Sequence, residues 1–531
     1  MSMKQIKLLL FLFFSLQIFA QESPWKIYWD EHLTEGKKNY LTATIKDTNT
    51  AKQPNIIIIL ADDLGQTDIS LYGSKYIETP NIDAIGKNGI TFTEGYISSP
   101  VCSPSRAGIL TGRYQQRFGH ELQMCERYVK NKLQYWGFGL KKNMRPLTPV
   151  LNKDVPTDED RMRQGLPPSE ITLAEILQKN FYHTAIIGKW HLGAMDFAKP
   201  CNRGFEYQYG FSEAYTLYAD PKDKNIVNYK IPHQFMDAHQ WKTAKGRTGN
   251  CAITKNCCTR VEETGYLTDK LTDEAIKYMS TQDSTHPFFI YLTYNAPHVP
   301  LQATTYYYNQ FAHIEDPIKR TYLAMIKNLD DQIGRLTKYL DSTGLSENTI
   351  VFFLSDNGGA YYNGTTDNKP YRGGKLTNFE GGLKVPFMMQ WKGKIESGIV
   401  SNPVISLDIF STVCKAANIY LPTDRVYDGI DLMHYTTKIT ERSLYWRSAE
   451  NSAIRSNNWK LIINDFDKTK LLYDLTESID ESNNVYTQYP KIATELENKL
   501  KTWNNQMGNP LWPRTVNYLY KDKLGIYYFA F

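Results

Sequence analysis

The chain has 531 residues, of which 41% are hydrophobic and 22% are charged, and its formal net charge at pH 7 is +5. This length and hydrophobic content are enough to bury a large core and exceed what one ordinary domain needs. The weak positive charge is compatible with an anionic substrate but gives no indication of nucleic-acid binding, so we expect no nucleic-acid partner.

Residues 1–20 are typical of a secretory signal peptide. Lys4 and Lys7 precede an apolar run from Leu8 to Phe14, and residues 15–20 form a plausible cleavage region. The run is too short to span a bilayer, and the alternative is a buried N-terminal helix. No later segment is apolar enough for a transmembrane helix, and no cysteine follows the cleavage region. We therefore expect an exported protein, periplasmic or secreted, without a membrane anchor.

Continuous apolar runs predict strands that are buried on both faces of a parallel sheet. Helical patterns alternate with them, which predicts a large α/β sandwich with a mostly parallel central sheet over residues 21–397. The predicted strands are 54–60, 184–188, 288–294 and 349–355, and the predicted helices are 171–180, 266–280 and 321–340.

Two irregular stretches, 120–168 and 211–262, are rich in aromatic and charged residues, and we expect them to form loops around a substrate. From residue 398 the pattern changes to one helix followed by short antiparallel strands. Residues 398–531 are therefore predicted to form a smaller α+β subdomain.

Polar residues follow each of the four predicted strands, where ligands bind in such folds. They include Asp62-Asp63, Lys189 with His191, Asn295 with His298, and Asp356-Asn357. Three carboxylates and one amide oxygen, from Asp62, Asp63, Asp356 and Asn357, form a hard, all-oxygen set of ligands. This set predicts one divalent cation, Ca²⁺ before Mg²⁺, and does not suit zinc.

The stretch PVCSPSRAGILTG, residues 100–112, places a cysteine at the start of a predicted helix. Ser103 is a suitable N-cap and Pro104 suits the first helical position, so Cys102 would lie where the helix dipole favours negative charge. Arg106 adds a cation one turn inside the helix. Cys102 is then either a thiolate nucleophile or the precursor of a modified residue, and a hard metal site is a poor partner for a soft thiolate.

Cys102-Ser103-Pro104-Ser105-Arg106, continuing to Leu110-Thr111-Gly112, resembles the signature of the formylglycine-dependent (type I) sulfatases, within the alkaline phosphatase superfamily. Further stretches resemble that family's motifs in its order, and the resemblance covers most of the chain. They are NIIIILADDLG at 55–65, IGKWHLG at 187–193, NAPHVPL at 295–301, SDNGG at 355–359 and RGGKLTNFEGGLKVPF at 372–387, and RSNNWKLI with LLYDL resembles the family's C-terminal subdomain.

The resemblance implies roles for the matching positions. Cys102 would be oxidised after translation to Cα-formylglycine by a maturation enzyme, and its hydrated form would place one oxygen beside the cation held by Asp62, Asp63, Asp356 and Asn357. The sulfate pocket would be lined by Arg106, Lys189, His191, His298 and Lys375. His298 or Lys375 would protonate the leaving alcohol, and His191 would take a proton from the second hydroxyl to expel sulfate.

One position departs from the family pattern. Phe181 stands where the family usually has a glycine that ends the preceding helix, and we expect Asn180 to adopt the left-handed conformation in its place.

The resemblance implies a bacterial exported sulfatase that releases inorganic sulfate from a sulfated oligo- or polysaccharide, with an algal polysaccharide such as ulvan favoured over an animal glycosaminoglycan. The alternatives are a phosphonate or phosphodiester hydrolase of the same superfamily and a catalytically inactive glycan-binding protein. Six further cysteines are available for disulfides, and their pairing does not follow from the sequence: 125, 201, 251, 257, 258 and 414.

Overall fold

The computed structural model of the chain describes residues 25–45, 53–124, 128–139, 146–232, 234–283, 285–433 and 441–530. The predicted signal peptide and Cys125 lie outside this part of the chain. Among the described residues, no helix has both the length and the apolar character needed to cross a membrane.

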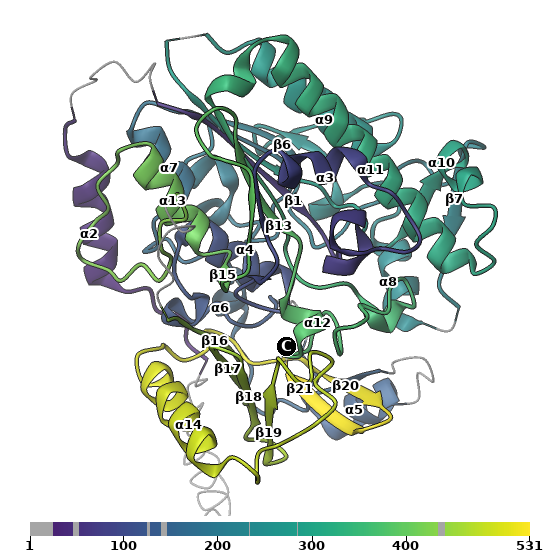
Figure 1. Cartoon of the computed structure of the whole chain (residues 1–531), viewed down its shortest axis with the longest axis vertical. Helices are drawn as coiled ribbons and strands as arrows, with labels where there is room; N and C mark the ends of the chain where they lie inside the picture. Colours follow the sequence, from purple (N-terminus) through teal and green to yellow (C-terminus); the bar gives the residue numbers. More distant parts are fainter. Residues whose placement is uncertain are drawn as a thin grey trace, which may run out of the picture.

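A ten-stranded sheet runs through the larger part of the molecule (Figure 1). The pairs from β12 through β1, β10 and β5 to β6 are parallel, and antiparallel pairs occur where β13 and β8 join this central part. The α/β class and the mostly parallel sheet predicted from the sequence are therefore confirmed. The order across the sheet is β14 (Gly398–Val400), β2 (Ile90–Phe92), β13 (Phe387–Trp391), β12 (Thr349–Ser355), β1 (Asn55–Ala61), β10 (Phe288–Thr293), β5 (His183–Lys189), β6 (Tyr207–Phe211), β8 (Thr254–Lys255) and β9 (Thr259–Arg260).

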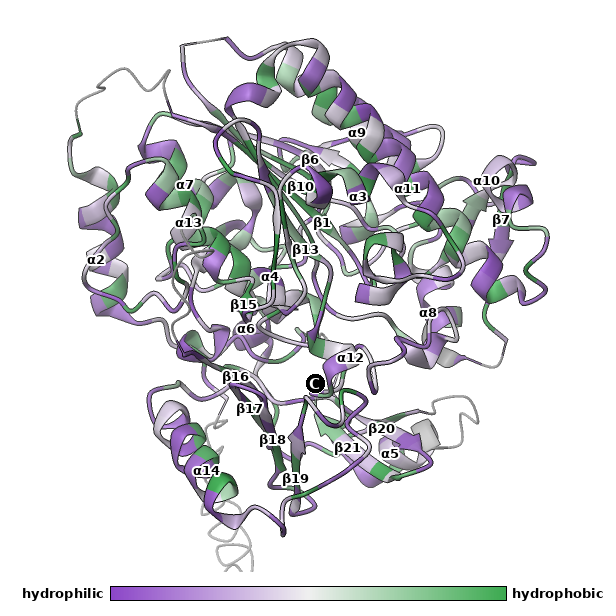
Figure 2. Ribbon diagram, viewed as in Figure 1, coloured by the Kyte–Doolittle hydropathy of each residue, from purple (hydrophilic) through white to green (hydrophobic). Residues whose placement is uncertain are grey.

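Helices cover both faces of this sheet, which explains why its central strands are continuously apolar. Ile57 and Ile59 of β1 pack with the helices of one face, and Ile56 and Ile58 pack with those of the other. Figure 2 shows the hydrophobic residues concentrated on the strands and on the inner sides of the helices. The first face carries α3 (Pro80–Lys87), α9 (Leu267–Ser280) and α11 (Pro317–Ser342), and the second carries α4 (Cys102–Thr111), α7 (Leu173–Lys179) and α13 (Asp408–Ala416).

Smaller elements surround this sandwich. The remaining helices are α2 (Glu31–Thr42), α5 (Lys132–Gly139), α6 (Asp158–Met162), α8 (Phe235–Thr243), α10 (Thr305–Gln310), α12 (Glu380–Leu383) and α14 (Pro490–Asn504). Two short strand pairs are β3 (Gly95–Tyr96) with β15 (Val404–Ile405), and β7 (Ile226–Tyr229) with β11 (Leu301–Thr304).

A separate antiparallel unit lies below the large sheet in Figure 1. One sheet consists of β16 (Ser443–Ser448), β17 (Asn451–Ser456), β18 (Trp459–Asn464) and β19 (Thr469–Asp474), and α14 packs against it. A second sheet consists of β4 (Leu147–Pro149), β20 (Val516–Asp522) and β21 (Gly525–Ala530). Segment 120–168, predicted only to form loops, therefore contributes a strand to this unit.

The chain remains in the large unit beyond the boundary predicted at residue 398. β14 begins at Gly398 and pairs with β2, and Ile409 and Phe410 of α13 belong to the core of the large unit. The strands of the four-stranded sheet begin only at Ser443.

Buried ion pairs join the two units. Lys460 Nζ of β18 lies 2.7 Å from Glu380 Oε1 of α12 and 2.9 Å from Glu481 Oε1. Arg372 binds Asp522 of β20 through two hydrogen bonds of 2.6 and 3.1 Å. Since Arg372 lies three residues before Lys375, the smaller unit anchors the loop that carries this predicted site residue.

The expectation for Asn180 is wrong. Asn180 has φ −97°, and Phe181 itself adopts the left-handed conformation with φ +64°. The tight turn into β5 therefore falls on the residue that replaces the family's glycine.

One disulfide, Cys201–Cys257, is formed among the described residues, while Cys251, Cys258 and Cys414 are free thiols.

Gly188 is a position where the fold requires glycine, and it directly precedes Lys189. Its φ is +119°, and a Cβ there would lie 1.9 Å from the carbonyl oxygen of Thr293 on β10. We expect Gly188→Ala to lower the free energy of unfolding by at least about 2 kcal/mol, because β5 and β10 must separate to admit the methyl group.

The matched control is Gly137→Ala. Gly137 lies in α5 with no atom within 4 Å of an added Cβ, and the exchange is expected to raise stability by about 0.5–1 kcal/mol. Chemical denaturation monitored by circular dichroism measures both variants. Equal effects of the two substitutions would contradict the proposed steric cause.

Candidate active site

The loops that follow β1, β10 and β12 hold one another at the carboxyl edge of the large sheet. The backbone N–H of Asp62 donates to Ala296 O at 3.1 Å, and that of Asp356 donates to Ala61 O at 3.1 Å. Asp63 has φ +65°, and its carbonyl accepts a hydrogen bond of 3.1 Å from the Tyr322 hydroxyl. These contacts fix the positions of the carboxylates predicted to bind the cation.

Cys102 is the first residue of α4, and the predicted cap is wrong by two positions. The Ser105 N–H donates to Val101 O at 3.1 Å, so the helix starts from Val101, which has no side chain able to cap it. Ser103 Oγ instead lies 2.8 Å from His120 Nε2. Pro104 still fits, because the first N–H groups of a helix have no partner within it. Cys102 Sγ lies 3.7 Å from Asp62 Oδ1.

Arg106 connects three elements at the site. Its guanidinium donates to Asp356 Oδ2 at 2.9 and 2.7 Å and to the carbonyl of Lys189 at 2.8 Å. The same group lies 3.8 Å from Asp62 Oδ2. Since its side chain is fully buried, this cation is held in one position by α4, β12 and β5 together.

Two lysines neutralise the remaining carboxylates. Lys189 Nζ lies 2.6 Å from Asp62 Oδ2, and Lys375 Nζ lies 2.7 Å from Asp63 Oδ1. Three buried cations therefore face three buried carboxylates, and the charges balance. A divalent cation added to this set would leave an excess of positive charge, which is what an anionic substrate requires.

The pKa values follow from this burial and these charges. Burial, followed by the charge of Asp356, raises the pKa of Cys102 to about 12, so the residue is a neutral thiol near pH 7. Burial alone would raise the pKa of Asp63, but the positive charge of Lys375 and the hydrogen bond from this lysine lower it to about 2. A protonated thiol does not support the interpretation of Cys102 as a thiolate nucleophile.

The two histidines are buried beside this network. His298 Nε2 lies 3.6 Å from Asp63 Oδ2, and His298 Nδ1 donates to the Val299 carbonyl at 2.5 Å. Burial lowers the pKa of His298 to about 3, and burial followed by Lys189 lowers the pKa of His191 well below its usual range. Both rings are therefore neutral in this state, and neutral His298 presents the Nε2 lone pair to the site.

Two oxygens at the site suit a metal ion. Asn357 Oδ1 and Asp63 Oδ2 are buried and accept no hydrogen bond, although Asn357 Nδ2 donates to Asp63 Oδ1 at 2.7 Å. Ligand atoms of Asp62, Asp63, Cys102 and His298 lie within 4.8 Å of one another. Asp356 is placed differently, because its Oδ2 is occupied by Arg106. The donor set thus fits a divalent cation. Asp356 lies next to this set, because its Oδ1 accepts a hydrogen bond of 3.3 Å from the Asp63 N–H.

Every site residue predicted from the sequence lies in or beside this network, but three supporting residues were missed. Gln123 Nε2 lies 2.8 Å from His191 Nε2. The Tyr218 hydroxyl lies 2.5 Å from Asn295 O and 2.8 Å from His298 O, and Tyr322 holds Asp63. Gln123 and Tyr218 belong to the two irregular stretches, which carry no pattern that indicates single residues.

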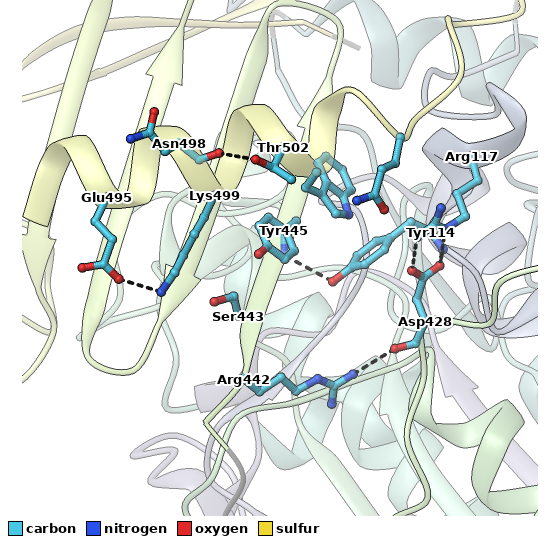
Figure 3. Close-up of a pocket in the computed structure, with 12 residues that line it drawn as sticks. Tyr114, Arg117, Asp428, Arg442, Ser443, Tyr445, Glu495, Asn498, Lys499 and Thr502 are labelled. Atoms are coloured by element: carbon cyan, nitrogen blue, oxygen red, sulfur yellow. Dashed lines mark hydrogen bonds and ion pairs between the residues drawn. The ribbon is translucent and has the colours of Figure 1, made fainter.

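A hollow of about 590 Å³ between α14 and β16 is a separate feature, and its cations are already paired (Figure 3). Arg117 binds Asp428 at 2.7 Å, and Lys499 binds Glu495 at 2.8 Å. Arg442, also in this hollow, binds Asp408 at 2.7 Å. We therefore place the anion-binding chemistry at Cys102 and not here.

Known proteins resemble this chain in sequence. Residues 54–419 match the family model named Sulfatase. An N-acetylgalactosamine-6-sulfatase of Rattus norvegicus is 33% identical over 386 residues, which cover 72% of this chain and 65% of that protein. A steryl-sulfatase of Homo sapiens is 30% identical over 455 residues, covering 75% of this chain and 72% of that protein. The match to the first of these relatives thus spans slightly less than two thirds of its length.

Solved structures share the fold. Ps i-CgsB, crystallised in complex with k-i-k-neocarrahexaose, aligns with a TM-score of 0.71 and 28% identity over 87% of this chain and 94% of that chain. A phosphonate monoester hydrolase of Agrobacterium radiobacter aligns with a TM-score of 0.55 and 17% identity over 86% of this chain and 96% of that chain, which shows the fold alone.

The arrangement of oxygens predicts which residues control cation affinity. We expect Asp63→Asn and Asp62→Asn each to weaken Ca²⁺ binding by at least about 10-fold, because each removes a negative charge beside the ion. Isothermal titration of the full chain with Ca²⁺ measures the loss.

The control for this prediction is Asp330→Asn. Asp330 is also buried, but it accepts hydrogen bonds from the backbone N–H groups of Asn81 and Ile82, which do not belong to the predicted site. Asp330→Asn should change the free energy of unfolding and leave the Ca²⁺ affinity unchanged. Unaltered affinity in both active-site variants would rule out these ligands.

Proposed function

The chain belongs to the sulfatase family, and we propose that it hydrolyses sulfate esters on a sulfated carbohydrate and releases inorganic sulfate. The observation that carries the proposal is the balanced set of three buried cations and three buried carboxylates around Cys102. Relatives named for sulfated amino sugars and a structural neighbour bound to an oligosaccharide support a glycan substrate. Among sulfated glycans, we favour an algal polysaccharide as the substrate.

Cys102 is proposed to act after conversion to Cα-formylglycine by a maturation enzyme. The buried thiol with its raised pKa is a poor nucleophile, so the unmodified residue offers no route to attack on sulfur. Hydrated formylglycine supplies two hydroxyls on one carbon, one to attack sulfur and one to lose a proton and release sulfate. Cys102 is the first residue of α4, and its Sγ and the guanidinium of Arg106 both lie near Asp62, at 3.7 Å from Oδ1 and 3.8 Å from Oδ2.

The cation is proposed to be Ca²⁺, held by Asp62, Asp63 and Asn357 with Asp356 beside them. It would supply positive charge for the sulfate oxygens. Lys189, Lys375 and Arg106 add fixed charges that lie within hydrogen-bonding distance of the carboxylates already. Because these side chains are almost fully buried, their charges act in a medium of low polarity, where they stabilise an anion more than they would in water.

Two proton transfers are assigned to the chain's own side chains. His191 is neutral and is assigned as the proton acceptor, and the hydrogen bond that its Nε2 accepts from Gln123 Nε2 must be released when that nitrogen takes the proton. The leaving alcohol needs a proton from His298 or Lys375. Lys375 carries one, since Asp63 outweighs the effect of burial and raises the pKa of Lys375 well above its usual range. His298 would first have to become charged, because its neutral ring donates only to Val299.

The proposed location is outside the cytoplasm, after removal of residues 1–20. The assay that tests the function is release of inorganic sulfate from a panel of defined sulfated oligosaccharides, with phosphate mono- and diesters as the comparison. Turnover of the phosphate esters alone would establish the alternative hydrolase, and no turnover of either class would indicate a glycan-binding protein.

The state of residue 102 is directly testable. Mass spectrometry of the peptide that contains residue 102, from active protein, should show the aldehyde or its hydrate in place of the thiol. Cys102→Ser should lose nearly all activity, since a sulfated serine has no second hydroxyl. Ser105→Ala, at a buried neighbour on the same helix, is the matched control and should retain the aldehyde. Full activity with an unmodified thiol would refute the proposal.

The proton donor is identified by how the leaving group affects each variant. General acid catalysis contributes about 10²–10⁴-fold when the leaving group is a basic sugar alkoxide, and little when it is a nitrophenolate. If His298 is the acid, His298→Ala should lose about that factor in kcat/KM on a sugar sulfate and much less on nitrophenyl sulfate.

Lys375→Ala is the paired variant in this comparison, and His313→Ala, an exposed histidine, is the control. Equal losses of His298→Ala on both substrates would show that His298 only binds sulfate. The selective loss should then appear in Lys375→Ala.

A further inference from the structure

Two histidines and an aspartate gather at the amino ends of β5 and β10, on the edge of the sheet opposite the candidate active site. His183 is the first residue of β5, and His286 lies two residues before β10. The His183 N–H donates to Pro287 O at 3.0 Å, so the two segments are joined at this point. One ligand atom from each of His183, Asp283 and His286 lies within 4.8 Å of the others.

Each imidazole makes one hydrogen bond through Nδ1. His183 Nδ1 lies 3.3 Å from Glu206 Oε2, and His286 Nδ1 lies 3.0 Å from Thr285 Oγ1. Coordination through Nε2 keeps both contacts. A histidine that binds a metal usually donates its other N–H to a carboxylate or another oxygen, which fixes the orientation of the ring. Glu206, just before β6, lies in that position for His183.

Asp283 is held next to His286 through its contacts with Thr285. Its Oδ1 accepts hydrogen bonds from the Thr285 N–H at 2.8 Å and from the Thr285 hydroxyl at 2.5 Å. These bonds orient the carboxylate, and they lower the pKa of Asp283, so it is an anion near neutral pH. Thr285 therefore contacts both the carboxylate and one imidazole of the cluster.

We propose that His183, His286 and Asp283 bind a transition-metal ion of the Zn²⁺ class, with Glu206 as the residue that positions His183. Two imidazole nitrogens and one carboxylate match the ligands of Zn²⁺ in proteins and leave one position for water. The ligand atoms around a tetrahedral Zn²⁺ ion lie about 3.3 Å from one another. The ligand atoms of the three side chains lie within 4.8 Å of one another, so the side chains must move closer together when the ion binds. His183 and Glu206 are 37% and 42% exposed, which leaves them room to rotate.

This site differs from the carboxylate cluster in both ligand chemistry and position. β5 carries His183 at one end and Lys189 at the other, so the two sites are about 20 Å apart. Imidazole ligands select Zn²⁺, whereas the oxygens near Cys102 select a hard cation. The ion would tie the segment before β10 to the start of β5.

The test titrates untagged full-chain protein with Zn²⁺ in saturating Ca²⁺. Any Zn²⁺ binding at the carboxylate cluster near Cys102 is then the same in every variant. We expect the unaltered protein to bind one more equivalent of Zn²⁺ than His183→Ala or His286→Ala, and Zn²⁺ to raise its melting temperature. Glu206→Gln should weaken Zn²⁺ binding by about 10–100-fold, because the carboxylate no longer orients His183. His313→Ala, which changes an exposed histidine elsewhere, should match the unaltered protein.

Equal Zn²⁺ stoichiometry and affinity in all variants, or no binding in the unaltered protein, would overturn the proposal. His183 begins a core strand, so His183→Ala is the variant at greater risk of folding poorly. His286 precedes its strand and is partly exposed. His286→Ala therefore decides the question by itself.

Discussion

The pair formed by Arg106 and Asp356 is the interaction on which the rest of the site depends. Both side chains are fully buried, and the guanidinium also binds the carbonyl of Lys189. One cation thereby fixes the first turn of α4, the end of β12 and the end of β5 relative to one another. Removal of either partner would leave an unpaired charge in the protein interior, which typically costs about 3–5 kcal/mol.

The same constraint extends outward through Lys375. This lysine binds Asp63, and its loop is held by Arg372, whose guanidinium contacts Asp522 of β20 and the Tyr473 hydroxyl of β19. The smaller unit therefore acts on the site although it supplies none of the residues proposed to contact sulfate. Its contribution is to limit where the Lys375 loop can lie.

The sequence predicts the central strands and the residues at their ends because both are local patterns. β1 is apolar from residue 56 to residue 61 since helices cover both faces of the sheet, and Asp62-Asp63 must then emerge at its carboxyl edge. The N-cap at Ser103 was wrong because His120, distant from any helix pattern, engages that hydroxyl. β4 was missed because it is a strand of only three residues that pairs with the distant segment 516–522. The local periodicity of the sequence does not indicate a pairing partner so far along the chain. Gln123 was missed for the same reason, since its role depends on a contact with His191 across 68 positions.

The burial of Cys102 has a consequence for the order of events during biogenesis. The residue is 2% exposed and is the first residue of a helix whose ten residues are all buried. A macromolecular catalyst has no access to Sγ in the folded protein, so the oxidation proposed for this residue would have to compete kinetically with collapse of the core. The pairing of β4 with β20 joins segments made far apart in time, which delays closure of the smaller unit. Conditions that accelerate folding relative to modification would therefore yield a protein that is correctly folded and permanently inactive.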